Sequence, residues 1–267
     1  MTKKISSTQN SLIKDLILYK EKSRARRRAG LFLIEGKREI GLAVKGGYTI
    51  VHLLYNPVIR SEDDCRALVP DVDECVEVSE DVYQRLAYRD GTEGILAVAK
   101  FKDFRLDELT FQRKNPLVLV AEAPEKPGNI GALLRTADAA RLDAVIIANP
   151  KTDMFNPNIV RSSVGCLFTN QIATGTTAEV IQFLRKNGIS IFCAALHSSS
   201  VEYSTINFTQ PSAIVVGTEA DGLSDEWLHQ ADSNIVIPMQ GAIDSLNVSV
   251  AAGILIFEAS RQRHFKS

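Results

Sequence analysis

The chain has 267 residues, so its length favours two domains over one large domain. Hydrophobic residues make up 45% and charged residues 24%, an ordinary globular composition that argues against a disordered chain, a collagen or a disulfide scaffold. No apolar run is long enough to span a bilayer, and the first ten residues lack the apolar segment of a signal peptide, so we expect a cytoplasmic protein.

The cysteines and histidines show no pattern typical of a metal site. Cys65, Cys75, Cys166 and Cys193 form no CxxC pair, so we expect reduced thiols and neither disulfides nor structural zinc. The four histidines have no HExxH spacing, which argues against a metal hydrolase. The chain also lacks GxGxxG after a strand, GxxxxGK[ST] and GxSxG. We therefore predict that the protein binds no metal. The sequence gives no support for a Rossmann or P-loop protein.

The formal net charge of −1 conceals a basic first segment. Residues 1–45 contain twelve Lys and Arg against four Asp and Glu, a net charge of +8, which leaves −9 for the rest. A basic segment on an acidic protein favours a nucleic-acid partner, although a solvated helix face is the ordinary alternative for a run of charges. The candidate nucleic-acid contacts are Lys22, Arg24, Arg26, Arg27, Arg28, Lys37 and Arg38.

The first part of the chain predicts a small alternating α/β domain. Residues 9–28 have apolar positions spaced by three and four, which predicts one helix capped by Asn10 or Ser11. Further helices are expected at 37–45, 61–68 and 80–86, and strands at 31–34, 50–55, 75–78 and 95–99. The charged stretch that follows has no strong period, so we expect a domain over 1–100, a linker over 101–115 and a second domain over 116–267.

The second domain alternates short buried strands with helices, which predicts a mostly parallel sheet covered on both faces. We expect strands at 117–121, 144–148, 190–195, 213–217 and 234–238, and helices at 130–140, 157–164, 178–187, 224–230 and from 248 onwards. Three of these strand ends carry polar residues and glycines. Loops at the carboxyl ends of strands are where open α/β sheets bind ligands.

The first polar strand end leads to Asn129 and Arg135. Asn129 is placed to cap the helix that follows, and an Arg in the first turns of a helix is unfavourable for the macrodipole. That placement indicates an anionic ligand, while a surface Arg lying over the helix is an equal alternative.

The second and third strand ends hold glycines beside polar groups. Gly217 and Gly222 indicate tight turns or close approach of a ligand, Glu219 is suited to a ribose hydroxyl or a partner domain, and Ser224 is a candidate helix cap. Before the last helix, Ser245 and Asn247 are either ligand-binding groups or caps, and the pattern leaves both open.

Taken together and in this order, the three stretches NIGALLR (129–135), IVVGTEADGLS (214–224) and IPMQGAIDSLNVSVAAGILIFE (237–258) resemble motifs 1, 2 and 3 of the SpoU/TrmH family of RNA ribose 2′-O-methyltransferases. The basic first segment resembles the L30e-like substrate-binding domain that many of these enzymes carry. The chain departs from the family at Tyr88–Gly94, where members often have Pro-Gln-Gly, and at Ser162, where Ala is usual.

The resemblance implies an α/β SPOUT domain with a trefoil knot, a homodimer, and S-adenosylmethionine bound in the knot. Residue matching implies a cofactor pocket formed by Gly217, Thr218, Glu219, Gly222, Ile237, Met239, Ser245 and Leu246. It places Asn129, Arg135, Glu219, Ser245 and Asn247 at catalytic positions.

The mechanism that follows from the resemblance aligns a ribose 2′-oxygen behind the sulfonium methyl group. Arg135 would hold the adjacent phosphate and favour the developing alkoxide, from the same subunit or from its partner, and Asn129 would orient Arg135. Ser245 and Asn247 would position ribose or cofactor. The L30e-like domain favours ribosomal RNA over transfer RNA. A non-catalytic RNA-binding or assembly protein that retains the fold and a base-methylating SPOUT enzyme are the alternatives.

Overall fold

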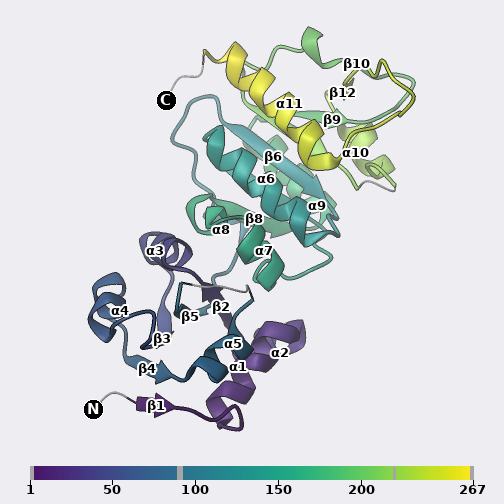
Figure 1. The fold of residues 1–267 in the computed structure, drawn as a ribbon. Coiled ribbons are helices and arrows are strands. Elements are labelled where there is room, and N and C mark those ends of the chain that lie inside the picture. Colours follow the sequence, from purple (N-terminus) through teal and green to yellow (C-terminus); the bar gives the residue numbers. More distant parts are fainter. Residues whose placement is uncertain (1–2, 89–92, 219–220, 265–267) are drawn as a thin grey trace. The chain divides into compact units, whose positions relative to one another are not determined.

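The computed structural model describes residues 3–88, 93–218 and 221–264, and contacts divide the chain into two compact units (Figure 1). The first unit comprises Met1–Lys102 together with Asp153–Thr169, and the second comprises Asp103–Thr152 together with Asn170–Ser267. The chain therefore leaves the second unit once, for the segment 153–169, and returns to it.

The first unit contains a mixed sheet of five strands in the order β1-β4-β3-β5-β2. Its strands are β1 (Lys3–Ile5), β2 (Leu31–Glu35), β3 (Ile50–Tyr55), β4 (Glu74–Val78) and β5 (Ile95–Lys100). The pairs β1–β4 and β4–β3 are parallel, whereas β5 is antiparallel to both β3 and β2. Four of these strands confirm the expected apolar runs, and β1 was not expected.

The helices of the first unit confirm three of the four expected before residue 100, while α7 was expected within the second domain and α8 was not expected. They are α1 (Ser11–Glu21), α2 (Ser23–Ala29), α3 (Lys37–Lys45), α4 (Glu62–Leu68), α5 (Glu80–Leu86), α7 (Pro157–Ser162) and α8 (Cys166–Thr169). The expectation of one helix over 9–28 is wrong, because Lys22 is extended (φ −120°, ψ 112°) and separates α1 from α2. Asn10 caps α1, since its side chain accepts a hydrogen bond from the backbone N–H of Leu12 at 3.0 Å.

Aromatic side chains tie the segment 153–169 into the first unit. The ring of Phe155 lies 4.3 Å from both Phe32 and Phe101, measured between centroids, and Phe168 lies 5.0 Å from Tyr48. Rings at these separations bury a large apolar area, which explains why this excursion from the second sheet packs with the first.

The second unit is built on a seven-stranded sheet in which all pairs are parallel, in the order β10-β12-β9-β11-β6-β7-β8. Its strands are β6 (Leu117–Glu122), β7 (Ala144–Ala148), β8 (Ile172–Gly175), β9 (Ser190–Ala194), β10 (Val201–Glu202), β11 (Ser212–Val216) and β12 (Ser233–Val236). The parallel sheet confirms the expectation, while β8 and β10 were not expected. The trefoil knot stays a prediction.

Helices cover both faces of this sheet. They are α6 (Pro127–Ala139), α9 (Thr177–Lys186), α10 (Asp225–Gln230) and α11 (Val248–Gln262), with short 3₁₀ turns η1 (Leu106–Glu108) and η2 (Tyr203–Thr205). Helices α6 and α11 pack against each other, as do α9 and α10 (Figure 1). The stretch 101–115, expected as a linker, is largely packed, because Leu106, Leu109 and Phe111 contact the core of the second unit. No described helix is both long and apolar enough to cross a membrane.

Candidate active site

The carboxyl ends of the seven parallel strands lie along one edge of the second sheet, and the polar loops predicted from the sequence follow three of them. β6 leads to α6, β11 leads to α10, and β12 leads to α11. β6 and β11 are neighbours in the sheet, but β6 connects to β7 on one side, whereas β11 connects to β12 on the opposite side. The direction of the connections therefore reverses between β6 and β11. Ligands of open α/β sheets bind at such positions.

Asn129 and Arg135 lie on α6, but the helix starts earlier than expected. It begins at Pro127, so Asn129 is its third residue and does not cap it. Arg135 is the ninth of 13 residues, which removes the argument from an unfavourable macrodipole at the first turn. Arg135 is exposed and makes no ion pair with any described residue. Its guanidinium is thus available to an anion on geometric grounds.

Asn247 joins the loop before α11 to the start of α6. Its side-chain oxygen accepts hydrogen bonds from the N–H of Ser249 at 3.0 Å and from the Ser249 hydroxyl at 2.6 Å, which makes it the cap of α11. Its amide nitrogen donates to the side-chain oxygen of Asn129 at 3.3 Å, across 118 residues of sequence. Ser245 does not cap the helix, and its exposed hydroxyl donates to Asp244 at 3.2 Å.

The loop after β11 folds back on itself within a few residues. The backbone N–H of Thr218 donates to the Gly222 carbonyl at 2.9 Å, and the Gly222 N–H donates to the Thr218 carbonyl at 3.2 Å. A Cβ at Gly217 would lie 2.1 Å from the Gly222 carbonyl oxygen, so no side chain fits there. Glu219, expected at both the cofactor and the catalytic site, lies outside the described residues.

The sequence reasoning missed a buried carboxylate at the end of β6. Glu122 is 6% exposed and accepts three hydrogen bonds: from the Ser224 N–H and hydroxyl, both at 2.8 Å, and from the Thr177 hydroxyl at 2.9 Å. Ser224 precedes α10 as expected, but its hydroxyl binds Glu122 instead of capping the helix. Asn149 completes this network by donating to Thr177 at 2.9 Å. The sequence signal that could have identified Glu122 is its position as the acidic last residue of the otherwise apolar strand β6.

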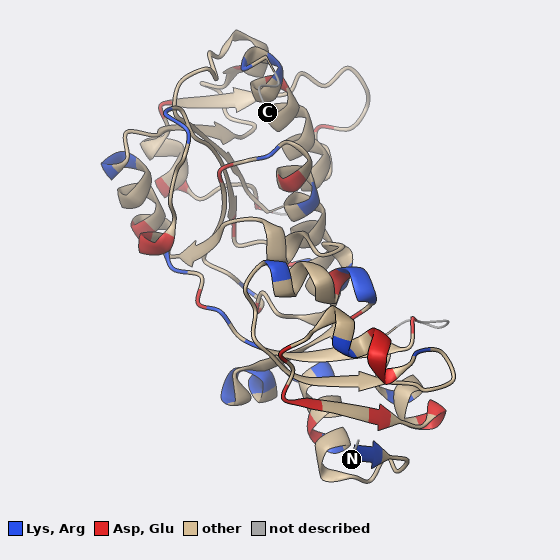
Figure 2. Ribbon diagram, turned by 90° about the vertical axis from the view of Figure 1, so that its left-hand side faces the viewer, with Lys and Arg blue, Asp and Glu red and all other residues tan. Residues whose placement is uncertain are grey.

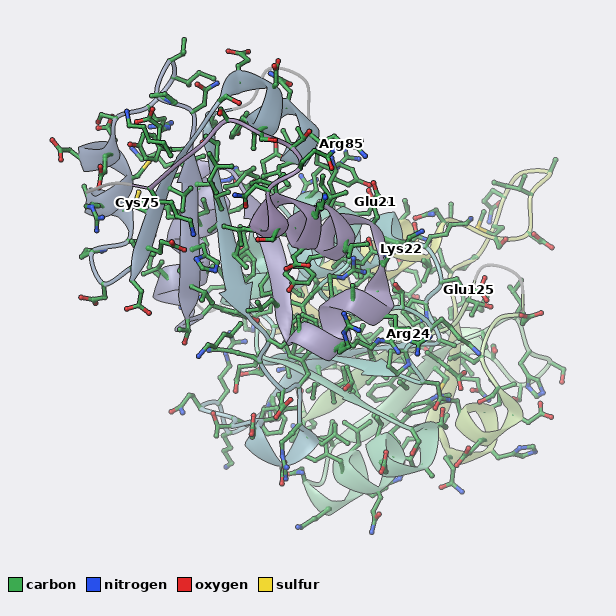
Figure 3. The ribbon with its side chains drawn as sticks, turned by 90° about the horizontal axis from the view of Figure 1, so that it is seen from below. Glu21, Lys22, Arg24, Cys75, Arg85 and Glu125 are labelled. Carbon is green, nitrogen blue, oxygen red and sulfur yellow. The ribbon has the colours of Figure 1, made fainter. Side chains whose placement is uncertain are left out.

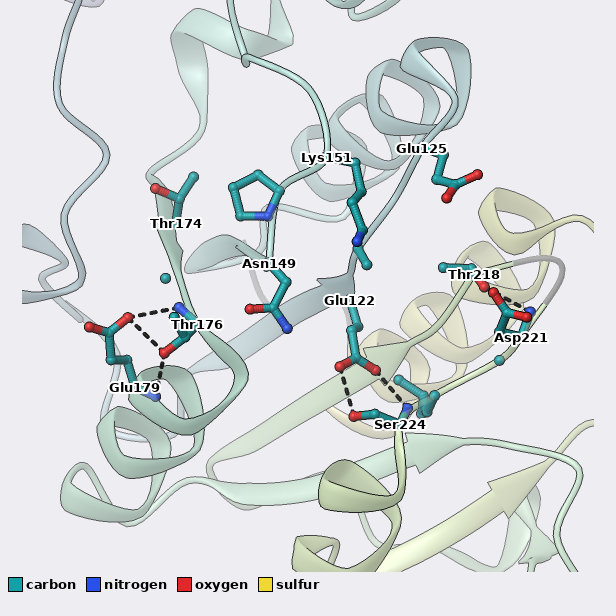
Figure 4. Close-up of a pocket in the computed structure, with 15 residues that line it drawn as sticks. Glu122, Glu125, Asn149, Lys151, Thr174, Thr176, Glu179, Thr218, Asp221 and Ser224 are labelled. Carbon is teal, nitrogen blue, oxygen red and sulfur yellow. Dashed lines mark hydrogen bonds between the residues drawn. The ribbon is translucent and has the colours of Figure 1, made fainter.

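An open cavity of about 830 Å³ lies beside this network, at the carboxyl ends of β6, β7 and β8 (Figure 4). Of the expected cofactor-binding residues, Thr218 and Gly222 line it, and Ile237, Met239, Ser245 and Leu246 do not. The cavity therefore shares only the β11 loop with the expected cofactor site.

The residues present fit S-adenosylmethionine between the loops after β11 and β12. These strands are separated only by β9, so their ends lie about 10 Å apart, a span that suits a nucleoside. In the β11 loop the backbone of Gly217 packs directly against that of Gly222, and the carbonyl oxygens of Thr218 and Gly222 can each accept one more hydrogen bond. Ile237, Met239 and Leu246 are partly exposed apolar side chains on the β12 loop. Backbone polar groups beside apolar side chains suit a nucleoside, whose base packs on apolar surface while its polar groups pair with the backbone.

Thiol and metal chemistry find no support in the described residues. Burial raises the pKa of Cys65 and of Cys193 to about 12, so neither thiol ionises near neutral pH. No three of the described His, Cys, Asp and Glu residues form a group able to hold a metal ion.

The candidate RNA contacts of the first unit are exposed, with one exception. Lys22, Arg24, Arg27, Arg28, Lys37 and Arg38 are all exposed. Figure 2 shows Lys and Arg in blue along α2, and Figure 3 shows Lys22 and Arg24 following Glu21 at the break between α1 and α2. The expectation for Arg26 is corrected, because this side chain is buried and binds Asp153 at 2.7 Å. Its charge stabilises the fold and does not face solvent.

A second feature of the first unit was not predicted. Tyr88 is 38% exposed, and its ring lies between two cations, with the Lys20 Nζ 5.6 Å and the Arg161 guanidinium carbon 5.3 Å from its centroid. Lys20 is held there by its bond to the Ala87 carbonyl at 2.6 Å. Exposed aromatic rings flanked by cations are typical of surfaces that stack nucleic-acid bases.

The second unit is thus an α/β domain whose parallel sheet carries polar and glycine-containing loops at the edge where such sheets bind ligands. A model of the SpoU rRNA Methylase family matches residues 116–257, and a model of an MRM3-like substrate-binding domain matches residues 10–97. The chain belongs to the SpoU family of RNA 2′-O-methyltransferases.

Relatives match over nearly the full chain. The 23S rRNA (guanosine(2553)-2′-O)-methyltransferase of Bacillus subtilis is 30% identical over 96% of this chain and 98% of its own. The 23S rRNA (uridine(2479)-2′-O)-methyltransferase of Streptomyces viridochromogenes is 32% identical over 89% and 85%. The crystal structure of an S-adenosylmethionine-bound rRNA methyltransferase from Sinorhizobium meliloti matches with a TM-score of 0.90 and 29% identity, covering 100% of this chain and 99% of that one.

Proposed function

We propose that the protein transfers a methyl group from S-adenosylmethionine to a ribose 2′-hydroxyl of 23S ribosomal RNA. The observation that carries this proposal is the hydrogen bond between Asn247 and Asn129, which brings the loop after β12 to the start of α6. Relatives matched along nearly their whole length act on 23S rRNA, which supports this substrate over transfer RNA.

The cofactor supplies an electrophilic methyl group on a sulfonium. We assign its binding to Gly217, Thr218 and Gly222 through their backbone, and to Ile237, Met239, Ser245 and Leu246 on the loop after β12. Glu219 completes both the cofactor and the catalytic sets on the strength of the sequence motif alone. The carbonyl oxygens of Thr218 and Gly222 support this assignment, because each accepts one bond from the other residue and has a second lone pair for a donor on the cofactor.

Arg135 is the group that would stabilise negative charge on the ribose oxygen. It is exposed and pairs with no described acid, so its guanidinium can bind the phosphate next to the reacting ribose and favour the 2′-alkoxide. Asn129 receives its orienting bond from Asn247, and Ser245 lies exposed in the same loop as Asn247. These side chains would hold the ribose in line with the methyl group.

RNA would be held by the first unit, in an L30e-like domain over residues 1–100. Lys22, Arg24, Arg27 and Arg28 gather exposed charge on and beside α2, and Lys37 and Arg38 add two cations at the start of α3. This charge would bind phosphates independently of sequence, and Tyr88 would stack an unpaired base.

A homodimer in the cytoplasm is the assembly we propose. Helix α11 leaves Val250 and Phe257 exposed at 50% and 43%, seven residues apart and therefore on one face. Large apolar side chains exposed on one helix face are typical of a protein interface. In such a dimer Arg135 can act on the cofactor of the partner subunit.

Labelled S-adenosylmethionine, incubated with the protein and either ribosomal or transfer RNA, tests the reaction. We expect label in 23S rRNA at one alkali-resistant linkage, since a 2′-O-methyl group blocks hydrolysis there. Labelled but alkali-sensitive sites would indicate base methylation, and RNA binding without label would indicate an assembly protein. Arg135→Ala should lower transfer at least 100-fold while cofactor affinity changes less than about threefold. Lys186→Ala, an exposed cation on α9, is the control.

A further inference from the structure

Glu122 stands where two adjacent strands of the second sheet end. Ala121 pairs with Val216, so Glu122 lies beside Gly217, the first residue of the loop after β11. Its carboxylate reaches past the strand end to Ser224, the last residue before α10. Gly217, at the start of this loop, is therefore held by the sheet, and Ser224, at its end, is held by this one side chain (Figure 4).

The contact suits a carboxylate, which accepts from all three of its partners. Three donors converge on the two carboxylate oxygens: the Ser224 N–H on one, and the Ser224 and Thr177 hydroxyls on the other. The Thr177 oxygen already accepts a bond from the Asn149 amide at 2.9 Å, so its own hydrogen must go to Glu122. A glutamine of equal size can still pair with all three groups, because hydroxyls also accept, but it replaces charge-assisted hydrogen bonds with neutral ones that are roughly half as strong.

The described residues of the loop after β11 also contact one another. Gly217 and Gly222 lie so close that a Cβ on Gly217 would be 2.2 Å from the Gly222 carbonyl carbon. The Asp221 N–H donates to the Thr218 hydroxyl at 2.9 Å, which closes the turn from within. These contacts join Gly217, Thr218, Asp221 and Gly222 to one another, and Glu122 is the side chain that anchors Ser224, where the loop ends.

We propose that Glu122 is a positioning residue for the methyl-transfer reaction, holding the loop after β11 in the orientation that binds the cofactor. The inference rests on the proposed assignment of Gly217, Thr218 and Gly222 to cofactor binding. Glu122 itself would not touch the cofactor, because both of its oxygens are occupied by the loop and α9.

The test compares Glu122→Gln with Glu226→Gln, the same change at an exposed acid in the first turn of α10. Calorimetric titration of the full chain with S-adenosylmethionine should show affinity about tenfold weaker for Glu122→Gln and unchanged for Glu226→Gln, and kcat at saturating cofactor should change less than threefold. Without cofactor, the peptide containing Ser224 should exchange its amide hydrogens faster in Glu122→Gln. Glu122→Asp should recover part of the affinity.

Equal affinity of Glu122→Gln and the unchanged protein would overturn the positioning role, as would a loss confined to kcat. If Glu122→Gln does not fold, Ser224→Ala removes only one of the three bonds and should weaken cofactor affinity about threefold, and unchanged affinity would again overturn the role. Failure of the proposed function is seen separately, because it appears as absent methyl transfer by the unmodified protein.

Discussion

Replacing Arg26 should destabilise the first unit far more than replacing its arginine neighbours on α2. The side chains of Arg26 and Asp153 are 3% and 7% exposed, and two nitrogen–oxygen distances of 2.7 and 3.2 Å join them. Arg26 also donates to the Tyr19 carbonyl at 2.7 Å, near the end of α1. Removing one partner of a buried ion pair costs about 3–5 kcal/mol, because the other charge stays buried without compensation. We expect that loss in the free energy of unfolding for Arg26→Met.

Urea unfolding of the full chain measures this loss. The chain has one tryptophan, Trp227, which is fully buried in the second unit, so its fluorescence follows that unit while circular dichroism follows both. Arg26→Met should lower the midpoint of the transition seen by circular dichroism and leave the fluorescence transition nearly in place. Arg24→Met, an exposed change on the same helix, should stay within about 0.5 kcal/mol.

A second substitution separates the ion pair from other effects of losing Arg26. When Asp153→Leu is added to Arg26→Met, an apolar pair replaces the buried charges, and most of the lost stability should return. Equal destabilisation by Arg26→Met and Arg24→Met would refute the reasoning, since it would mean that the Asp153 contact contributes no more than a surface charge.

Two further substitutions test α11. Hydrogen bonds from Arg261 and Gln262 lower the pKa of Glu258 from 4.5 to about 2. The stabilisation by Glu258 is therefore complete above pH 4.5 and is lost as the pH falls to 2. In melting curves, Glu258→Gln should remove on the order of 1 kcal/mol of this pH dependence, and an unchanged acid profile would contradict the assignment. Asn247→Asp keeps the helix cap but loses the donor to Asn129. We expect a melting temperature within about 2 °C of that of the unmodified protein and methyl transfer about tenfold slower. Full activity would refute a role for this hydrogen bond.

The strands of the second sheet could be predicted because burial on both faces leaves a continuous apolar run. Val118 and Val120 face one layer of helices, and their neighbours in the strand face the other, so β6 has no polar position before Glu122. The edge strand β10 has only two residues, both exposed, and no burial constrains them to an apolar pattern. β10 forms because it pairs with β12, and two residues are too few to show an alternating or apolar pattern from which a strand could be predicted.

The break between α1 and α2 could not be predicted from local preference, because Lys22 and the arginines that follow it are good helix formers. The chain turns there, and Arg26 can then reach both the end of α1 and Asp153, which lies 127 residues further along the sequence. The same contact explains the error at Arg26. Charge density along the sequence groups it with Arg24, Arg27 and Arg28, whereas only the fold shows that its side chain points inward.

Asn247 shows how a local rule and a site contact can depend on the same side chain. Capping uses its oxygen, which accepts from the Ser249 N–H, and this fixes the orientation of the amide plane. The nitrogen must then point away from α11, and Asn129 is the acceptor that it reaches. Serine would cap the helix equally well, but its shorter side chain has a single hydroxyl for both contacts, and aspartate would have only acceptors. The capping rule therefore explains a polar residue at this position, while the choice of asparagine follows from a partner 118 residues away, which no local pattern can reveal.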